Sequence, residues 1–407
     1  MSATRVGLWL ALLVCGCSSN ETASGSNSGG SPGAGGASTA SGGAAQGGNT
    51  SVGNGGAASQ SSGGTNAAGA ASAGTTSAGT TSAGTTSGIC GAAEGQLFDA
   101  SYPWNQKVSS APLDSESNAI IQYLEKNHTA SARFQIDGTS DEANNTYGLV
   151  LLRADASTPH RAFTPSDDFY EPDCDDAAPP MPSGGAIEGE TGYACNGDGD
   201  CHLLVIDTAA CRLYEMWRAN ATSSRFEGGC QAVWDLRAPY EPTLRGDCCT
   251  SADAAGLPIA AHTFTADEVA AGEIKHAIRF ILPNEHMRAR VYVRPATHST
   301  SATSGPASAP PYGARMRLKA SVDVSRLTPG ARVVAKALKE YGMILSDGGN
   351  LTFTAANDRF TTAKWRDVDL SARDLTGLHW SDFEVVELGT RYTFDASCDC
   401  NRTPISE

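Results

Sequence analysis

The chain has 407 residues, a formal net charge of −15 at neutral pH, 45 glycines and 12 cysteines. This length allows two or three domains of about 100 to 200 residues each. A surplus of acidic side chains argues against nucleic acid as a partner, because phosphate groups are neutralised by basic surfaces. The sequence also lacks the short motifs of serine hydrolases, zinc peptidases, P-loop proteins and dinucleotide-binding domains.

Residues 1–16 have the pattern of an export signal. Arg5 supplies a positive charge, and residues 7–14 form an apolar stretch that is too short to cross ~30 Å of hydrocarbon. The motif VCGC, which ends at Cys17, resembles the lipobox of bacterial lipoproteins. This resemblance implies removal of residues 1–16, an anchor in the lipid bilayer through lipidated Cys17, and a place at the outer membrane or cell surface of a Gram-negative bacterium. The alternative is an ordinary secretory signal followed by release.

Residues 17–88 form a low-complexity segment of Gly, Ser, Ala and Thr after the cysteine. Its only charged residue is Glu21, and Val52 is its only branched aliphatic residue. Such a composition cannot bury enough apolar surface to offset the entropy of ordering the chain. We therefore expect a disordered tether here, followed by a single disulfide-braced globular domain over residues 89–407.

Cysteine usage indicates an oxidising compartment. Ten cysteines remain in the folded part, and an even number in an exported protein predicts up to five disulfides. Cys90 at the start of the domain is a candidate to clasp Cys398 or Cys400 at its end. The alternative, a structural zinc site, fits poorly because the cysteine spacings do not form two C-x2-4-C pairs.

Strand patterns outnumber helix patterns in the folded part. Alternating or continuous apolar runs predict strands at residues 147–152, 202–207, 211–218, 230–236, 274–282, 288–294, 315–322 and 351–353. One helix is expected after Thr328-Pro329 and before Gly342, and another begins near Asp114. This pattern predicts a mainly β fold, an antiparallel sandwich or jelly-roll with two or three covering helices; the alternative is an α+β fold.

Residues 273–319 invert the charge of the chain, with eight cations against two acids. The alternation places Arg288, Arg290, Tyr292 and Arg294 on one strand face, and it places Arg315, Arg317 and Lys319 on another. If the two strands pair, they form a guanidinium-rich face that suits carboxylate or sulfate groups and a sugar ring. The alternative is that these side chains are solvated or are neutralised by acids elsewhere in the chain. The substrate-binding candidates are Arg279, Arg290, Tyr292, Arg315, Arg317 and Lys319, with His276 and His298.

Three carboxylates are candidates for acid–base catalysis. Glu215 alternates with apolar residues along a strand, where desolvation would raise its pKa and suit a general acid. Asp235 follows a tryptophan, and Asp253 lies in a turn with Ser251. Each also has a purely structural interpretation, as a strand carboxylate or as a turn cap.

The histidines give weaker signals. His276 is in phase with apolar neighbours and so is more typical of a core residue, whereas His202 and His298 lie at strand ends. Together the three are an alternative metal site, but they lack the short ligand spacings that usually mark one, so we expect no metal and no cofactor.

Several motifs between Thr250 and Gly342 resemble those of an uncharacterised family of exported bacterial proteins. They are TSADAAGLP, EVAAGEIKHAIRF, RPATH, RMRLKASVD and ALKEYGMIL followed by Asp347. The resemblance covers about residues 102–392 and implies no activity, fold or cofactor.

The sequence thus predicts a cell-envelope lipoprotein that acts as a surface-tethered hydrolase or lyase on an extracellular polysaccharide, with an anionic polymer suited to the arginines. Its predicted partners are the lipid bilayer and the polysaccharide. The alternative is a non-catalytic surface module that binds a glycan or a protein.

Overall fold

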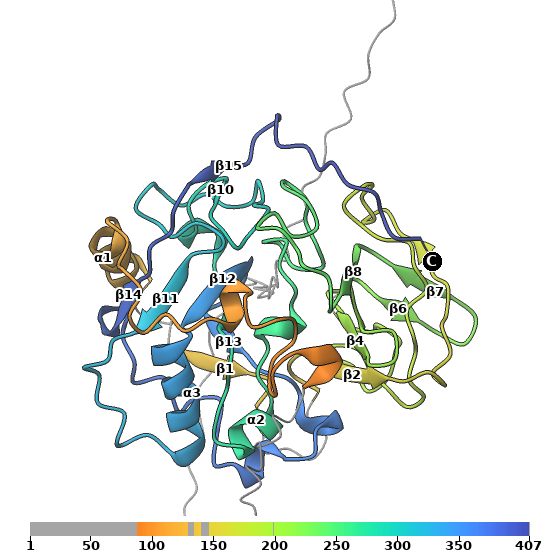
Figure 1. The fold of residues 1–407 in the computed structure, drawn as a ribbon, viewed down its shortest axis with the longest axis horizontal. Helices are drawn as coiled ribbons and strands as arrows, with labels where there is room; N and C mark the ends of the chain where they lie inside the picture. Colours follow the sequence, from red (N-terminus) through yellow and green to blue (C-terminus); the bar gives the residue numbers. More distant parts are fainter. Residues whose placement is uncertain (1–87, 129–133, 140–145, 198, 407) are drawn as a thin grey trace, which may run out of the picture. The chain divides into compact units, whose positions relative to one another are not determined.

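The computed structural model describes residues 88–128, 134–139, 146–197 and 199–406 (Figure 1). The expected signal peptide, lipidated Cys17 and tether lie outside these residues. Within the described part, no helix is long and apolar enough to cross a membrane.

The larger sheet has six strands in the order β1-β13-β9-β12-β11-β14. β1 pairs with β13 and β12 pairs with β9 in parallel, and the remaining pairs are antiparallel. The strands are β1 (Gln135–Asp137), β9 (Ile278–Leu282), β11 (Arg315–Leu318), β12 (Met343–Gly348), β13 (Thr352–Thr354) and β14 (Phe383–Val385).

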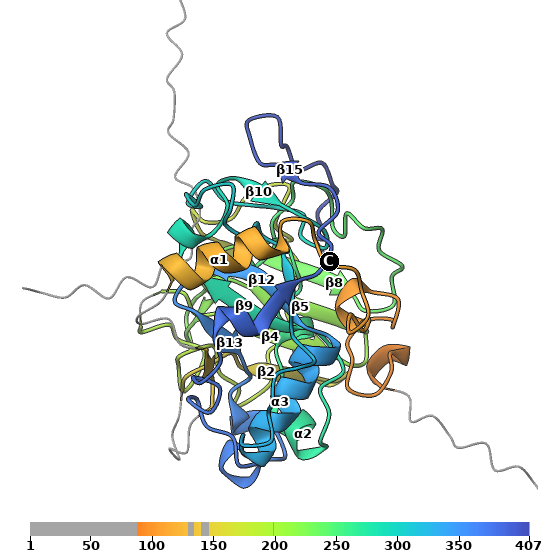
Figure 2. The ribbon, with the colours of Figure 1, turned by 90° about the vertical axis from the view of Figure 1, so that its left-hand side faces the viewer.

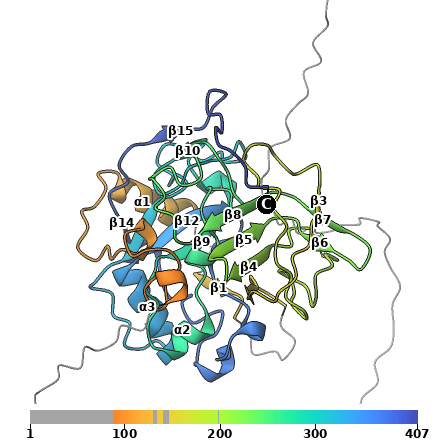
Figure 3. The same cartoon turned by 45° about the vertical axis from the view of Figure 1, so that its right-hand side comes forward.

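A second sheet has four strands in the order β2-β4-β5-β8, of which only β2 and β4 are parallel. Figure 3 shows β4, β5 and β8 between the larger sheet and a small three-stranded sheet, β3-β7-β6. A two-stranded ribbon joins β10 (Val291–Tyr292) to β15 (Tyr392–Thr393). The other strands are β2 (Leu151–Ala154), β3 (Thr164–Pro165), β4 (Leu203–Asp207), β5 (Arg212–Met216), β6 (Asn220–Ala221), β7 (Phe226–Gly228) and β8 (Gln231–Asp235).

Three α-helices accompany the sheets: α1 (Ser117–Asn127), α2 (Ala266–Ala270) and α3 (Pro329–Glu340). The Thr328 side chain caps α3 by accepting from Ala331 N, and Pro329 is its first residue, as the sequence predicted. Gly342 ends α3 with φ of +74°, where a Cβ would lie 2.4 Å from the Met316 carbonyl oxygen. α1, β14 and α3 lie together on the left-hand side of Figure 1, which is the side that faces the viewer in Figure 2. Short 3₁₀ turns are η1 (Ile89–Gly91), η2 (Pro103–Asn105), η3 (Ala260–His262), η4 (Asn284–His286), η5 (Asp358–Phe360), η6 (Trp365–Asp367) and η7 (Trp380–Asp382).

The four-stranded sheet is buried on both faces. On one face, Leu213 and Trp234 belong to the same hydrophobic cluster as the six-stranded sheet and α3. On the other face, Val205, Tyr214 and Val233 pack in a second cluster with residues of β6 and β7. Because both faces are buried, the sequence of β4 is a continuous apolar run and does not alternate between apolar and polar residues.

Five disulfides link the ten cysteines, so the predicted number is confirmed. They are Cys90–Cys211, Cys174–Cys230, Cys195–Cys201, Cys248–Cys398 and Cys249–Cys400. The expected clasp between Cys90 and the C-terminal cysteines is wrong, because Cys90 pairs with Cys211 at the start of β5. The adjacent Cys248 and Cys249 instead hold the C-terminal segment. Disulfides in this number are typical of proteins in oxidising compartments.

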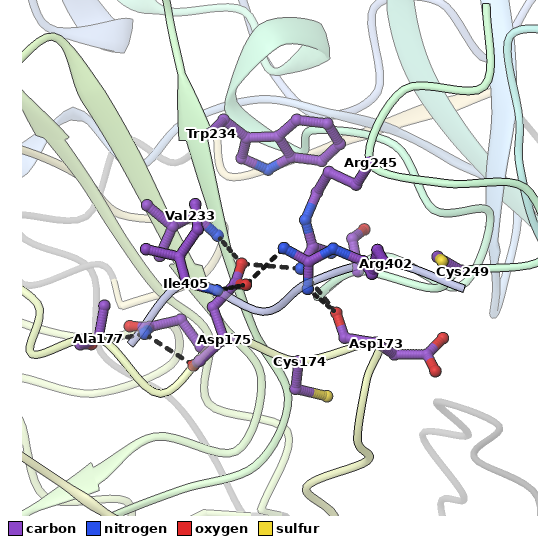
Figure 4. A network of polar contacts seen from close by, with 12 residues as sticks. Asp173, Cys174, Asp175, Ala177, Val233, Trp234, Arg245, Cys249, Arg402 and Ile405 are labelled. Carbon is purple, nitrogen blue, oxygen red and sulfur yellow. Dashed lines mark hydrogen bonds and ion pairs between the residues drawn. The ribbon is translucent and has the colours of Figure 1, made fainter. Parts of the chain in front are cut away.

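A buried polar network also fastens the C-terminal segment (Figure 4). The side chain of Asp175 is fully buried and accepts from Arg245 at 2.8 Å and from Arg402 at 2.6 Å. Its carboxylate also accepts from the backbone N–H groups of Val233 and Ile405. Because two guanidinium groups and two amides satisfy one carboxylate, the tail is anchored against β8 rather than being free to move.

The predicted fold class, mainly β with two or three helices, is confirmed. The sheets combine parallel and antiparallel pairs, where the sequence favoured antiparallel pairing. Several strands are shorter than their apolar runs: the run at 288–294 contributes only Val291–Tyr292, and the run at 274–282 becomes a strand only from Ile278. His276 and Ala277 precede that strand, and the Ala277 N–H bonds to the Trp104 carbonyl outside any ladder.

Candidate functional site

A pocket of about 340 Å³ opens between the six-stranded and four-stranded sheets. Strands β1, β9, β12 and β13 supply one wall, and the segments that precede β2 and β4 supply the other. The ionisable side chains that line it are unusually numerous for so small a space. They are Asp137, Glu188, Asp200, His202, Arg279 and Asp347.

The strand register aligns the first of these side chains. Asp137 on β1 lies opposite Thr354 on β13, and β13 in turn pairs with β9, which carries Arg279. Residues at one level of adjacent strands project from the same face of a sheet. The Arg279 Nη1 group accordingly donates to the Thr354 hydroxyl at 3.2 Å. A polar row therefore crosses three strands of the buried sheet.

A β-bulge brings Asp347 to the same face. The pairing of β12 with β9 runs regularly up to Leu345, and the register then shifts so that Asp347, not Ser346, lies opposite Ile281. A bulge re-aims the side chains that follow it. Here the Asp347 carboxylate reaches Arg279 Nη2 at 2.9 Å. Without the extra residue, strand alternation would direct Asp347 to the opposite face.

Asp253 approaches Arg279 from the TSADAAGLP turn. Ser251 organises this turn, because its hydroxyl accepts from Asp253 N at 3.0 Å and donates to the Leu257 carbonyl at 2.8 Å. Asp253 Oδ1 then accepts from Arg279 Nε at 3.0 Å and from Nη2 at 2.8 Å. Gly256 in the turn has φ of +73°, and a Cβ there would meet the Thr297 hydroxyl at 2.2 Å. One buried guanidinium is therefore shared by two aspartates.

Burial raises the pKa of both Asp253 and Asp347 above the ordinary carboxyl range, although Arg279 opposes this. One guanidinium compensates one negative charge, and Glu215 and Asp200 add further negative charge nearby. The two carboxyl groups titrate as a coupled pair. The pair therefore takes up a proton at a pH where isolated aspartates are fully ionised.

Asp137 is a third carboxyl group with a raised pKa. Burial, reinforced by the negative charge of Glu188, raises the pKa of Asp137 to about 6. Asp137 therefore titrates closer to neutral pH than an ordinary aspartate, as do Asp253 and Asp347. Neighbouring carboxyl groups whose environments separate their pKa values can act as acid and base in one site.

One group of described pocket residues is arranged so that it could hold a metal ion. It consists of Glu188, Asp200 and His202, whose ligand atoms lie within 4.8 Å of one another. His202 Nδ1 lies 2.6 Å from Glu188 Oε2, and its Nε2 lies 3.2 Å from the Ala252 carbonyl. Although burial lowers it, the Glu188 carboxylate raises the pKa of His202 to about 10, which favours a protonated ion pair. Trp217 Nε1 donates to Asp200 at 2.6 Å and orients it.

Of the three predicted catalytic carboxylates, only Asp253 is connected to the pocket, through its hydrogen bonds with Arg279. Glu215 is fully buried on β5 and accepts from Trp234 Nε1 and from the backbone N–H groups of Ile259 and Ala260. Burial raises the pKa of Glu215 to about 7, but the carboxylate holds the start of η3 in place and does not line the pocket. Asp235 lies at the far end of β8, half-exposed, beside Arg237.

The guanidinium-rich face is not formed. Between Arg288 and Arg294 only β10 (Val291–Tyr292) is a strand, and it pairs with β15, whereas β11 pairs with β12 and β14. Arg288 binds Glu116, Arg294 and Tyr292 bind Asp247, and Arg290 is exposed. The expectation of a common groove is therefore wrong, because internal acids already neutralise most of this segment.

The cations of β11 have structural partners as well. Arg315 is buried and donates to the carbonyl groups of Pro103, Gln106 and Tyr341. Arg317 binds Glu384 and the carbonyls of Val108 and Ala111, and Lys319 donates to the Ser381 carbonyl. Of the predicted substrate anchors, only Arg279 lies in the pocket.

The predicted histidine candidates are separated by their contacts. His276 Nε2 lies 3.1 Å from Glu268 Oε1 beside helix α2, and His298 Nδ1 lies 2.8 Å from the Ala254 carbonyl. The described residues do not bring these two histidines and His202 into one group of metal ligands.

Sequence reasoning missed most of the pocket residues. Asp137, Glu188 and Asp200 come from short or irregular segments without apolar periodicity, and nothing in their spacing connects them. Asp347 follows the ALKEYGMIL motif, which was the one available signal. Comparison of the chain with models of protein families, with curated proteins and with solved structures finds no match.

Proposed function

We propose that this protein is an extracytoplasmic glycan hydrolase whose active site is the pocket between the two sheets. In this proposal Asp347, coupled to Asp253, donates a proton to the glycosidic oxygen, and Asp137 accepts a proton from the attacking water. The single observation that supports it is that two carboxyl groups with raised pKa values, those of Asp137 and Asp347, line the same pocket.

Direct attack by water requires room for a water molecule between the two carboxyl groups. β13 and β9 lie between β1 and β12, and Asp347 pairs with Ile281, two residues along β9 from the level of Asp137. The two backbones are therefore about 16 Å apart at ~4.8 Å per strand and ~3.3 Å per residue. Asp347 reaches back toward Arg279 on β9, which shortens the gap between the carboxyl groups. Inverting glycosidases separate their carboxyl groups by about 6.5–9.5 Å to accommodate a water molecule. In the proposed step the anomeric C–O bond breaks, the leaving oxygen takes the Asp347 proton, and the water oxygen bonds to the anomeric carbon.

The charge of the pocket argues for a neutral or amine-bearing substrate rather than an anionic one. Four carboxyl groups line the pocket against Arg279 and His202, and Asp253 already engages Arg279. His202 is engaged by Glu188 in the same way. Because no guanidinium remains uncompensated there, a sulfate or uronate group would meet net negative charge.

The place of action follows from the disulfides and from the sequence. Five disulfides support an oxidising compartment. Lipidation at Cys17 and a flexible tether, which the sequence predicts, would hold the domain at the outer membrane or cell surface, within reach of polymers outside the cell.

The test is a reducing-end assay with the full-length protein and a panel of neutral, amino and anionic polysaccharides. We expect cleavage of a neutral or amino polymer, and we expect Asp347→Asn and Asp137→Asn to lower kcat/KM by about 100-fold or more. Asp235→Asn is the matched control, because Asp235 is a half-exposed aspartate outside the pocket.

Three outcomes would count against the proposal. Equal activity of Asp347→Asn and Asp235→Asn would remove Asp347 from the chemistry. An unsaturated product would indicate a lyase rather than a hydrolase. Binding of a polysaccharide without release of reducing ends from any polymer would favour the alternative, a non-catalytic glycan-binding module.

A further inference from the structure

A second pocket adjoins the acidic one. It also has a volume of about 340 Å³, and four residues line both pockets: Asp137, Tyr147, Ile281 and Thr352. Other residues line only the second pocket. Among them are Gln135 on β1, Thr139 just after β1, and Asn350 in the loop between β12 and β13. The two pockets are therefore neighbours beside β1 of the six-stranded sheet.

The chemistry of the second pocket differs from that of the first. Among the described residues that line it, Asp137 is the only ionisable acid or base apart from the phenol of Tyr147. The other polar groups are the exposed amides of Gln135 and Asn350 and the hydroxyls of Thr139 and Thr352. Amides and hydroxyls both donate and accept hydrogen bonds, which suits a ligand whose own polar groups are hydroxyls.

Among the described residues that line the second pocket, Thr139 stands out by its buried hydroxyl. Thr139 is only 6% exposed, and its Oγ1 has no hydrogen-bond partner among the residues that the structure describes. A buried polar atom without a partner is costly, so native structures nearly always satisfy such atoms. By contrast, the Thr352 hydroxyl already lies 3.2 Å from the Gln135 carbonyl. A ligand hydroxyl beside Thr139 would supply the missing bond.

Tyr147 stands at the boundary of the two pockets. Tyr147 is 71% exposed to solvent, and few other large hydrophobic residues in the described part of the chain are exposed. The negative π face of a tyrosine packs well against the C–H groups on one face of a sugar ring, while its edge remains in water. Exposure of an aromatic ring at the mouth of a polar pocket is therefore what a sugar-binding platform requires.

We infer that this second pocket binds a neutral sugar unit next to the one that is cleaved, with Tyr147 as the platform and Thr139 as a hydrogen-bonding residue. This inference rests on the proposed glycan hydrolase, and it specifies the substrate as a polymer whose neighbouring unit carries hydroxyl groups and no charge.

The test measures binding separately from turnover. Neutral oligosaccharides of two to six units from cellulose, xylan, mannan, starch and chitin are titrated into the full-length protein and into its Asp347→Asn variant by calorimetry. We expect at least one series to bind, and we expect Tyr147→Ala and Thr139→Val each to weaken its binding about tenfold. Thr139→Ser should retain the affinity, and Phe360→Ala is the matched control, because Phe360 is an exposed aromatic residue outside both pockets.

The kinetic counterpart distinguishes this inference from the proposed function. On a polymer that is cleaved, Tyr147→Ala and Thr139→Val should each raise KM by a larger factor than they lower kcat. If no series binds, or if Tyr147→Ala binds as tightly as Phe360→Ala, the second pocket is not a sugar site even where cleavage is observed. If oligosaccharides bind with the expected losses but no polymer is cleaved, the hydrolase fails and the sugar site stands.

Discussion

Replacement of Arg279 by methionine removes the one guanidinium that the buried Asp253 and Asp347 share. Methionine has a similar length and no charge, so the change leaves little space unfilled. Breaking a buried ion pair by removing one partner costs about 3–5 kcal/mol, because the remaining charge is left uncompensated. At pH 8 we therefore expect the melting temperature to fall by roughly 10 °C.

The loss of stability in Arg279→Met should depend on pH, and the pKa shifts of the two aspartates determine the direction. In the folded wild-type protein burial already raises the pKa of both aspartates above their unfolded values. A raised carboxyl pKa means that the folded state binds more protons than the unfolded state, so stability falls as the pH rises through the folded pKa. Without Arg279 both pKa values rise further. One additional bound proton changes the free energy of unfolding by about 2.7 kcal/mol over two pH units, so the variant should recover most of its loss at pH 5.

Thermal unfolding followed by circular dichroism at pH 5, 6, 7 and 8 measures this effect, with disulfides intact. Arg290→Met is the matched control, because the Arg290 side chain is exposed. The combined Arg279→Met, Asp253→Asn and Asp347→Asn variant should be more stable at pH 8 than Arg279→Met alone. An equal loss at pH 5 and pH 8 would refute the reasoning, since it would mean that lost packing rather than unpaired charge causes the destabilisation.

Two further predictions concern the same site. The pH dependence of kcat/KM should be bell-shaped: activity falls below about pH 6, as Asp137 becomes protonated, and falls again above about pH 7, as Asp347 loses its proton. Asp137→Asn should lower the rate throughout and abolish the acid limb, and an acid limb that survives this change would assign the base elsewhere. Glu215→Gln should lower stability by about 1–3 kcal/mol, because the introduced amide faces N–H donors of Trp234, Ile259 or Ala260. It should leave kcat/KM within about threefold, since Glu215 does not line the pocket; a 100-fold loss of kcat without loss of stability would restore Glu215 as the general acid.

Features encoded within a few neighbouring residues were predictable. The cap at Thr328, the proline that follows it and the glycine at position 342 define α3 almost to the residue. The apolar runs at residues 202–207, 211–218 and 230–236 similarly predicted the three strands β4, β5 and β8. Even the number of disulfides followed from an even cysteine count. In each case the deciding interaction lies within the element itself or depends on composition alone.

The candidate site was not predictable in this way. Asp347 is separated from Arg279 by 68 residues, and it faces the pocket only because a bulge shifts the register of β12. The alternation of side chains along a strand predicts which face of the sheet each one occupies, but it does not reveal a single extra residue at a bulge. Asp137 and Glu188 reach the pocket from a three-residue strand and from a segment outside any strand.

The arginines of residues 288–319 likewise combine a feature that the sequence predicted with one that it did not. Their alternation along the chain was clear in the sequence, but their partners were not. Arg315 binds carbonyl groups more than 200 residues away, at Pro103 and Gln106, and Arg317 binds Glu384. The sequence by itself determined the local elements and the number of disulfides, because these depend on neighbouring residues or on composition alone. Only the tertiary structure decided which charges meet, because a charged side chain is neutralised by whichever group the packing of distant strands brings beside it.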